Sequence, residues 1–151
     1  MVKRLDDSDA PPELLDHIGI RLWRAAYTWK RAFDDGMVAM GHGWFAQARS
    51  GLLAHMDRQG TRQSVLAERS GLTKQAVQQF IDELVADGIV ERSADPSDGR
   101  GRMINFTARG RKVLADANVV KRRIEFEFRQ KIGDQRFRQL FETLGKLGGV
   151  E

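Results

Sequence analysis

Residues 61–84 read TRQSVLAERSGLTKQAVQQFIDEL, and this stretch decides which fold the chain adopts. Two short helices are expected within it, over residues 63–69 and from Thr73 onward, because Gly71 interrupts the helical pattern between them. Thr61 and Thr73 each suit a helix N-terminus, where a threonine oxygen can accept a hydrogen bond from a free backbone N–H. Two helices joined by so tight a connection predict a helix-turn-helix.

The apolar residues of the same stretch predict which face of each helix is buried. Leu66 and Ala67 can pack inward from the first helix, and Val77 can anchor the second helix against them. Leu72 is expected to fill the angle between the two helices. Five residues of the second helix are left to face outward, namely Lys74, Gln75, Ala76, Gln78 and Gln79.

A β-hairpin is expected directly after the second helix, which stops at Asp87-Gly88. Residues 89–92 suit a short strand, and residues 94–99 are dense in turn-forming residues. Residues 102–107 alternate between polar and apolar, as a half-buried strand does. A helix-turn-helix followed by such a hairpin, or wing, predicts a winged helix.

Amphipathic helices are expected on both sides of this unit, over residues 13–33, 44–56, 108–132 and 134–147. Their apolar residues recur at three- and four-residue steps and so form an apolar stripe along each helix. The small core of a winged helix cannot cover all of these stripes. A second copy of the chain is the expected cover, which predicts a two-fold dimer. The expected fold is therefore mainly α with a small β-hairpin. The chain divides into a flexible arm (1–12), a helical dimerisation region (13–60 and 108–151) and a winged helix-turn-helix lobe (61–107).

Composition narrows the class of protein. The 151 residues suit one domain, and the net charge of +4 favours an acidic partner. The absence of cysteine excludes disulfides, thiolate zinc sites and a cysteine nucleophile. No apolar run is long enough to span a membrane and no signal peptide is visible, so a cytoplasmic protein without a membrane partner is expected.

The helix-turn-helix and the hairpin together resemble the DNA-binding core of the MarR family, the multiple-antibiotic-resistance regulators. The matching residues are Leu66-Ala67, Gly71-Leu72-Thr73, Val77, Leu84, Gly88-Ile89-Val90-Glu91-Arg92, Asp95-Pro96-Ser97-Asp98-Gly99-Arg100, Thr107 and Gly110. The order of the flanking helices fits as well. The resemblance implies a homodimer that binds pseudopalindromic operators in double-stranded DNA, with the second helix of the helix-turn-helix in the major groove.

The outward-facing residues have side chains that suit DNA. Glutamine can make paired hydrogen bonds to adenine, Ala76 could touch a thymine methyl group, and Lys74 suits a phosphate. The resemblance places Arg100 in the minor groove, with Arg102 as the alternative and Asp98 as an acid that could orient a wing arginine. The competing interpretation is an ordinary solvated helix face and a solubilising hairpin tip. The candidate DNA-binding residues are Thr73, Lys74, Gln75, Ala76, Gln78, Gln79, Arg100 and Arg102.

The resemblance also implies a small aromatic or phenolic effector, and aromatic residues near the helix junctions could line its pocket. Packing in the core and the dimer interface is the competing interpretation of these residues. The candidate effector residues are His17, Arg21, Trp23, Tyr27, His42 and Trp44. The three histidines lack the spacing of metal ligands, so neither a metal site nor a cofactor is expected.

Two functions remain open at this stage. The first is a sequence-specific dimeric transcription regulator, a repressor that a small molecule relieves. The second is a winged-helix architectural or protein-interaction module that does not read bases. No nucleophile elbow or pair of catalytic carboxylates is visible, so an enzyme is not expected.

Overall fold

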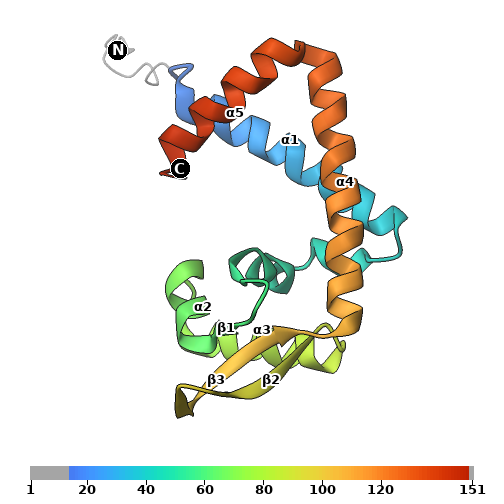
Figure 1. The fold of residues 1–151 in the computed structure, drawn as a ribbon. Helices are drawn as coiled ribbons and strands as arrows, with labels where there is room; N and C mark the ends of the chain where they lie inside the picture. The colour runs from blue at the N-terminus through green and yellow to red at the C-terminus, as the bar shows by residue number, and fades with distance from the viewer. Residues whose placement is uncertain (1–13, 150–151) are drawn as a thin grey trace, which may run out of the picture.

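The computed structural model describes residues 14–149 and has the expected fold class, mainly α with a small β-sheet (Figure 1). The predicted arm over residues 1–12 lies outside the described residues. The elements in chain order are α1 (Ile18–Ala39), the 3₁₀ segments η2 (Gly43–Ala46) and η3 (Ala48–His55), β1 (Thr61–Arg62), α2 (Gln63–Ser70), α3 (Lys74–Ala86), β2 (Val90–Asp95), β3 (Asp98–Phe106), α4 (Ala108–Ile132) and α5 (Asp134–Gly148).

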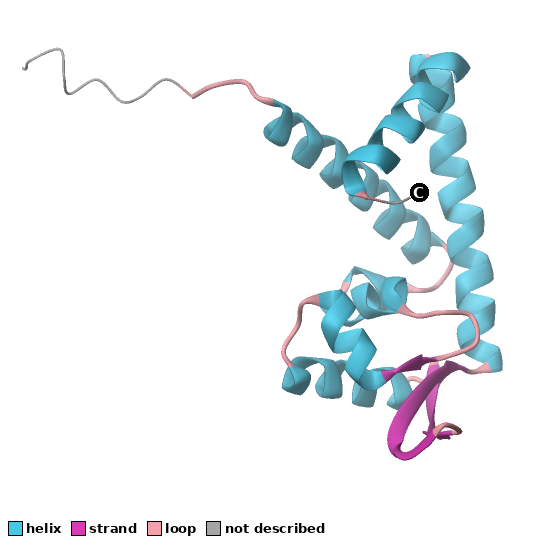
Figure 2. Ribbon diagram, turned by 60° about the vertical axis from the view of Figure 1, so that its left-hand side comes forward, coloured by secondary structure: helices cyan, strands magenta, loops and turns pink. Residues whose placement is uncertain are grey.

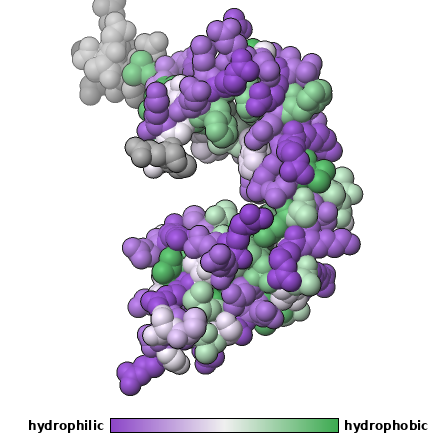
Figure 3. Space-filling model, viewed as in Figure 1, coloured by the Kyte–Doolittle hydropathy of each residue, from purple (hydrophilic) through white to green (hydrophobic). Residues whose placement is uncertain are grey.

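Helix α4 connects the two parts of the molecule. Its N-terminal end leaves the sheet, α1 crosses it near its middle, and α5 follows it and folds back toward α1 (Figures 1 and 2). We call α1, α5 and the C-terminal half of α4 the helical arm, and residues 61–107 the winged-helix lobe. Figure 3 shows that the surface is hollowed between the helical arm and the winged-helix lobe, on the side away from α4.

One continuous core joins these two parts. Phe33 and Met37 of α1 belong to the same buried cluster as Ile124 of α4 and as Leu66 and Ile81 of the winged-helix lobe. The crossing of α1 and α4 is close at Gly36, where an added Cβ would lie 2.4 Å from the Val120 Cγ1. Glycine therefore lets the two helices approach each other.

The predicted bounds of the first two helices were wrong. Helix α1 starts at Ile18 and runs past residue 33, its expected end, to Ala39, and Gly36 lies at the crossing with α4 without ending the helix. The single helix expected over residues 44–56 is two 3₁₀ segments separated by an extended Gln47. The Ser50 hydroxyl donates to the Phe45 and Gln47 carbonyl oxygens and so occupies acceptors that an α-helix would use.

The sheet has three antiparallel strands in the order β1-β3-β2, one more than the predicted hairpin. Strand β1 pairs Thr61 with Ile104, and it is too short to give an alternating pattern. The expected capping role of Thr61 was wrong, because its hydroxyl oxygen accepts from the Asp57 backbone N–H at 2.7 Å and Arg62 precedes α2 without a side-chain cap. Strands β2 and β3 meet at a two-residue tip, Pro96-Ser97.

Candidate nucleic-acid interface

Helix α3 exposes the polar residues that the sequence predicted. The Thr73 side chain accepts from the Ala76 backbone N–H at 3.1 Å and starts the helix, as expected. Val77 and Ile81 are fully buried against the lobe, which fixes the rotation of α3 about its axis. The side chains of Lys74, Gln75, Gln78 and Gln79 are therefore exposed, and Ala76 is partly covered.

The turn before α3 has one feature as predicted and one that differs. Gly71 has a φ of +66°, a left-handed conformation that glycine adopts without strain. Leu72 does not fill the angle between α2 and α3, because 40% of it is exposed. Leu66 and Val77, both fully buried, already occupy the space between the helices.

Two of the three α3 glutamines are held by neighbouring side chains. The Gln78 amide nitrogen donates to the Asp82 carboxylate at 3.0 Å, and its oxygen accepts from Gln63 of α2 at 2.6 Å. Gln79 donates to Glu83 at 3.1 Å. Within residues 14–149, no hydrogen bond is recorded for the Gln75 side chain, so this amide is the most available to a new partner.

Asp82 accepts from the Gln78 amide, and Arg92 of β2 compensates its charge. The Arg92 guanidinium forms an ion pair with the Asp82 carboxylate. The hydrogen bond from Arg92, followed by the one from Gln78, holds the pKa of Asp82 below its ordinary value. The side chain therefore stays an anion that Arg92 neutralises, and the first wing strand is tied to α3.

The wing carries both predicted arginines on β3, and Arg100 and Arg102 are exposed. Asp98 makes a different contact from the predicted ion pair: its carboxylate accepts the backbone N–H of Arg100 at 3.1 Å. Among the described residues, no ion pair joins Asp98 to an arginine. Asp98 therefore shapes the hairpin backbone at Arg100 and does not orient the guanidinium.

Asp95, which sequence reasoning missed as a contact residue, lies next to the tip. It is only 4% exposed, and its carboxylate accepts the backbone N–H of Ser97 at 2.9 Å and the Ser97 hydroxyl at 2.8 Å. Arg62 forms an ion pair with the other carboxylate oxygen. The Ser97 bonds first, and Arg62 after them, hold the pKa of Asp95 below its ordinary value. A signal was present in the sequence, since an Asp before Pro-Ser often accepts hydrogen bonds from a turn, but its partner Arg62 is distant in sequence.

The six candidate effector residues do not line one cavity. His17 and Arg21 are exposed near the start of α1, with Arg21 paired to Asp16. The Trp23 and Tyr27 rings stack on each other 5.5 Å apart on the surface of α1. His42 bonds to Asp116 of α4 at 2.8 Å, and Trp44 packs beside Phe45 in the core.

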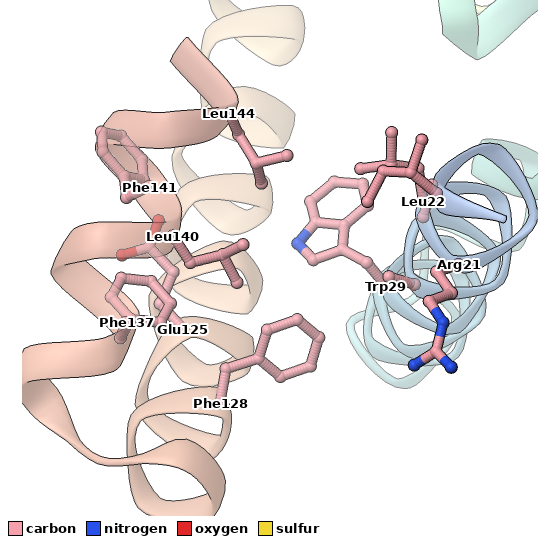
Figure 4. A pocket seen from close by; sticks show the side chains of 12 residues that line it. Arg21, Leu22, Trp29, Glu125, Phe128, Phe137, Leu140, Phe141 and Leu144 are labelled. Atoms are coloured by element: carbon pink, nitrogen blue, oxygen red, sulfur yellow. The ribbon is translucent and has the colours of Figure 1, made fainter. Parts of the chain in front are cut away.

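A large apolar cavity instead lies inside the helical arm, between α1 and the α4–α5 pair (Figure 4). Its volume is about 650 Å³, and of the six candidate residues only Arg21 lines it. Figure 4 shows Leu140, Leu144 and Phe128 facing Trp29 and Leu22 across the space, with the Arg21 guanidinium directed away. The walls are almost entirely apolar, so the cavity suits apolar side chains better than a polar ligand.

Membrane insertion of a helix is not indicated by the described residues. None of the helices between residues 14 and 149 combines the length and the apolar character that crossing a bilayer requires.

Comparison with known proteins finds a family match over part of the chain. The model of the MarR family matches residues 47–101, which cover η3, α2, α3 and most of the wing. The transcriptional regulator HosA of Escherichia coli O111:H- is 31% identical over 88 residues, which are 58% of this chain. The match spans 64% of the length of HosA.

Solved structures extend the similarity over most of the chain. CouR from Rhodococcus jostii RHA1, bound to p-coumaroyl-CoA, is 28% identical with a TM-score of 0.68 and covers 87% of this chain and 92% of its own. The apo form of MarR from E. coli is 18% identical with a TM-score of 0.71, covers 89% of this chain and 98% of its own, and shows the shared fold. Residues 47–101 therefore resemble the MarR family, and the fold of most of the chain is the one found in CouR and MarR.

Proposed function

We propose that the protein is a homodimeric, sequence-specific DNA-binding transcription regulator, a repressor that a small molecule relieves. The observation that carries this proposal is the winged-helix lobe itself, in which α3 exposes Lys74 and Gln75 while the wing exposes Arg100 and Arg102. A second structure of CouR, described as a transcriptional repressor, is bound to a 23-mer DNA duplex. That protein is 24% identical to this chain, with a TM-score of 0.71.

The dimer is proposed from the helical arm. The cavity there is lined by apolar side chains of both chain-terminal helices, and several remain exposed around it, including Ile18 at 69% and Leu140 at 44%. A monomer would leave this surface in water, whereas a second copy can bury it. In this proposal the helical arm is the dimerisation region and residues 61–107 are the DNA-binding lobe.

The remaining parts of the proposal follow from the DNA partner and from the relatives. In this proposal the regulator works in the cytoplasm, as its relatives from bacteria would, and it needs no enzymatic activity. Release by a small molecule is supported by CouR, whose structure contains p-coumaroyl-CoA. The six predicted effector residues do not line one cavity in the single chain, and their role in binding an effector stays a prediction.

The test starts from duplexes selected from a random 30-bp library by binding to the wild-type protein, called here the selected duplex. A sequence-specific regulator should bind the selected duplex at least 10³-fold more tightly than an unrelated duplex at physiological salt. An architectural or protein-interaction module should show no enrichment of a sequence and similar affinity for both duplexes. The second result would overturn the proposal.

If α3 reads bases, replacing Gln75 and replacing Gln79 should have different effects on DNA sequence preference. We expect Gln75→Ala to remove about 1–3 kcal/mol of discrimination between the selected duplex and single-base variants, because the Gln75 amide is unengaged. Gln79→Ala should cost less, since Gln79 must first leave Glu83. Fluorescence anisotropy against a panel of variant duplexes measures both. Unchanged preference in both proteins would show that α3 does not read bases.

The wing gives a prediction about salt dependence. We expect Arg100→Ala to weaken binding to the selected duplex and to reduce the magnitude of the log affinity–log salt slope by about one unit, since one cationic contact is lost. Arg102→Ala is the matched variant and should have the smaller effect. Affinities over a salt series decide this. An Arg100→Ala protein with the wild-type affinity and slope would mean that the wing does not contact DNA.

A further inference from the structure

The wing tip is anchored to the helix-turn-helix by a carboxylate that faces inward. Asp95 is the last residue of β2, and the pairing register with β3 shifts between Ala94 and Asp95. This irregularity turns the strand so that Asp95 is buried while its neighbours Ala94 and Pro96 are exposed. An aspartate in an exposed hairpin ordinarily points its carboxylate into water. Because the Asp95 carboxylate is buried instead, it needs groups that pair with its charge.

Arg62 and Ser97 are those partners. The Arg62 guanidinium forms an ion pair with Asp95 and also donates to the Ser97 hydroxyl at 2.6 Å. Ser97 in turn donates to Asp95 at 2.8 Å, so the three side chains close a ring of contacts across the wing tip. One oxygen of the buried carboxylate accepts the hydrogen bonds from Ser97 and the other is ion-paired with Arg62, which offsets the cost of removing the charge from water.

Two neighbours fix where this ring lies. Arg62 belongs to β1 and directly precedes α2, so it moves with the helix-turn-helix. Gly101 leaves room for the carboxylate, because an added Cβ there would lie 3.0 Å from the Asp95 Cβ and 3.1 Å from one Asp95 oxygen. Arg100, next to Gly101, is therefore placed by the same contacts that hold Asp95.

We propose that Arg62 and Asp95 form a positioning pair that holds the wing tip, and with it Arg100, at a set place relative to α3. This inference rests on the proposed DNA-binding function and adds a determinant to it. Neither residue needs to touch DNA for the effect. The pair limits the positions of a tip that lies beyond the β1–β3 pairing and the Arg92–Asp82 contact, and so lowers the entropy that DNA binding must remove.

The sign of the charge effect makes the proposal testable. Asp95→Asn removes one negative charge near a polyanion, and electrostatics alone would then tighten DNA binding. Loss of the ion pair with Arg62 predicts the opposite result, weaker binding. Glu91→Gln is the matched control, because Glu91 lies on the same strand, is exposed, and loses the same charge without breaking these contacts.

The experiment measures affinity for the selected duplex at one fixed salt concentration. We expect Asp95→Asn to bind roughly tenfold more weakly, the size of one coupled buried contact. Glu91→Gln should bind as tightly as the wild type or more tightly. Ser97→Ala, which keeps every charge and changes an exposed residue, should weaken binding by roughly threefold. If the Asp95→Asn protein does not fold, the affinity of the Ser97→Ala protein still tests the proposal.

A double-mutant cycle separates positioning from general destabilisation. If the pair acts through the wing arginine, Asp95→Asn or Ser97→Ala should add little to the loss already caused by Arg100→Ala. Wild-type affinity in both Asp95→Asn and Ser97→Ala, or an undiminished loss in the Arg100→Ala background, would overturn the inference. Failure of the wild type to prefer the selected duplex would instead overturn the proposed function.

Discussion

Replacing both Leu140 and Leu144 with aspartate is expected to convert the protein from a dimer to a monomer and to abolish tight binding to the selected duplex. Both side chains face the apolar cavity of the helical arm, and both remain more than 40% exposed in the single chain (Figure 4). In a dimer they would be buried, and two unpaired carboxylates in that interface cost several kcal/mol. Sedimentation velocity at micromolar concentration measures the outcome.

The control places the same charges elsewhere on α5. Gln135 and Gln139 are exposed and do not line the cavity, so aspartate at both positions should leave the sedimentation coefficient unchanged. Circular dichroism shows whether the Leu140→Asp, Leu144→Asp protein keeps its helices. A folded double variant that still sediments as a dimer, or a wild type that sediments as a monomer, would contradict this role of the helical arm.

A large loss of stability is expected from a substitution at the junction between the wing and α4. Gly110 is buried, and an added Cβ would lie 2.0 Å from the carbonyl oxygen of Ile89. That oxygen cannot move away freely, because it accepts the Thr107 backbone N–H at 3.1 Å. We expect Gly110→Ala to lower the free energy of unfolding by roughly 3 kcal/mol, as overpacking against fixed backbone does.

Urea unfolding followed by circular dichroism measures this change. Gly99→Ala is the matched control, because nothing lies within 4 Å of an added Cβ at Gly99 and its φ is not positive. Its free energy of unfolding should stay within about 0.5 kcal/mol of the wild type. A Gly110→Ala protein as stable as Gly99→Ala would mean that the backbone at Ile89 yields easily.

The features that sequence predicted well are those with local signals. Helix α4 begins after Thr107, whose hydroxyl oxygen accepts the Gly110 N–H, and it ends at Gly133, as expected. Val77 and Ile104 are fully buried where the helical and alternating patterns placed them. In each case residues within a few positions of one another determine the structure.

The features that sequence missed depend on residues distant in the chain. Strand β1 exists because β3 offers it a partner, and two residues carry no period of their own. The Arg62–Asp95 contact joins residues on different strands, and a single sequence does not indicate that pairing. The place of Gly36 at the helix crossing likewise depends on Val120 of α4, which is distant in sequence. The roles of the candidate DNA-binding residues stay predictions, because they depend on a partner.

The 25 residues of α4 form one uninterrupted helix from the wing to the helical arm. At 1.5 Å per residue such a helix is about 37 Å long, close to the roughly 34 Å that separates two major-groove half-sites on one face of DNA. In the proposed dimer, α4 transmits a change of angle at the helical arm to the winged-helix lobe. A tilt of about 5° at the helical arm displaces the other end by roughly 3 Å, enough to misplace both α3 helices on a rigid duplex. The angle between the two copies of α4 therefore sets which operator spacing the dimer can bridge.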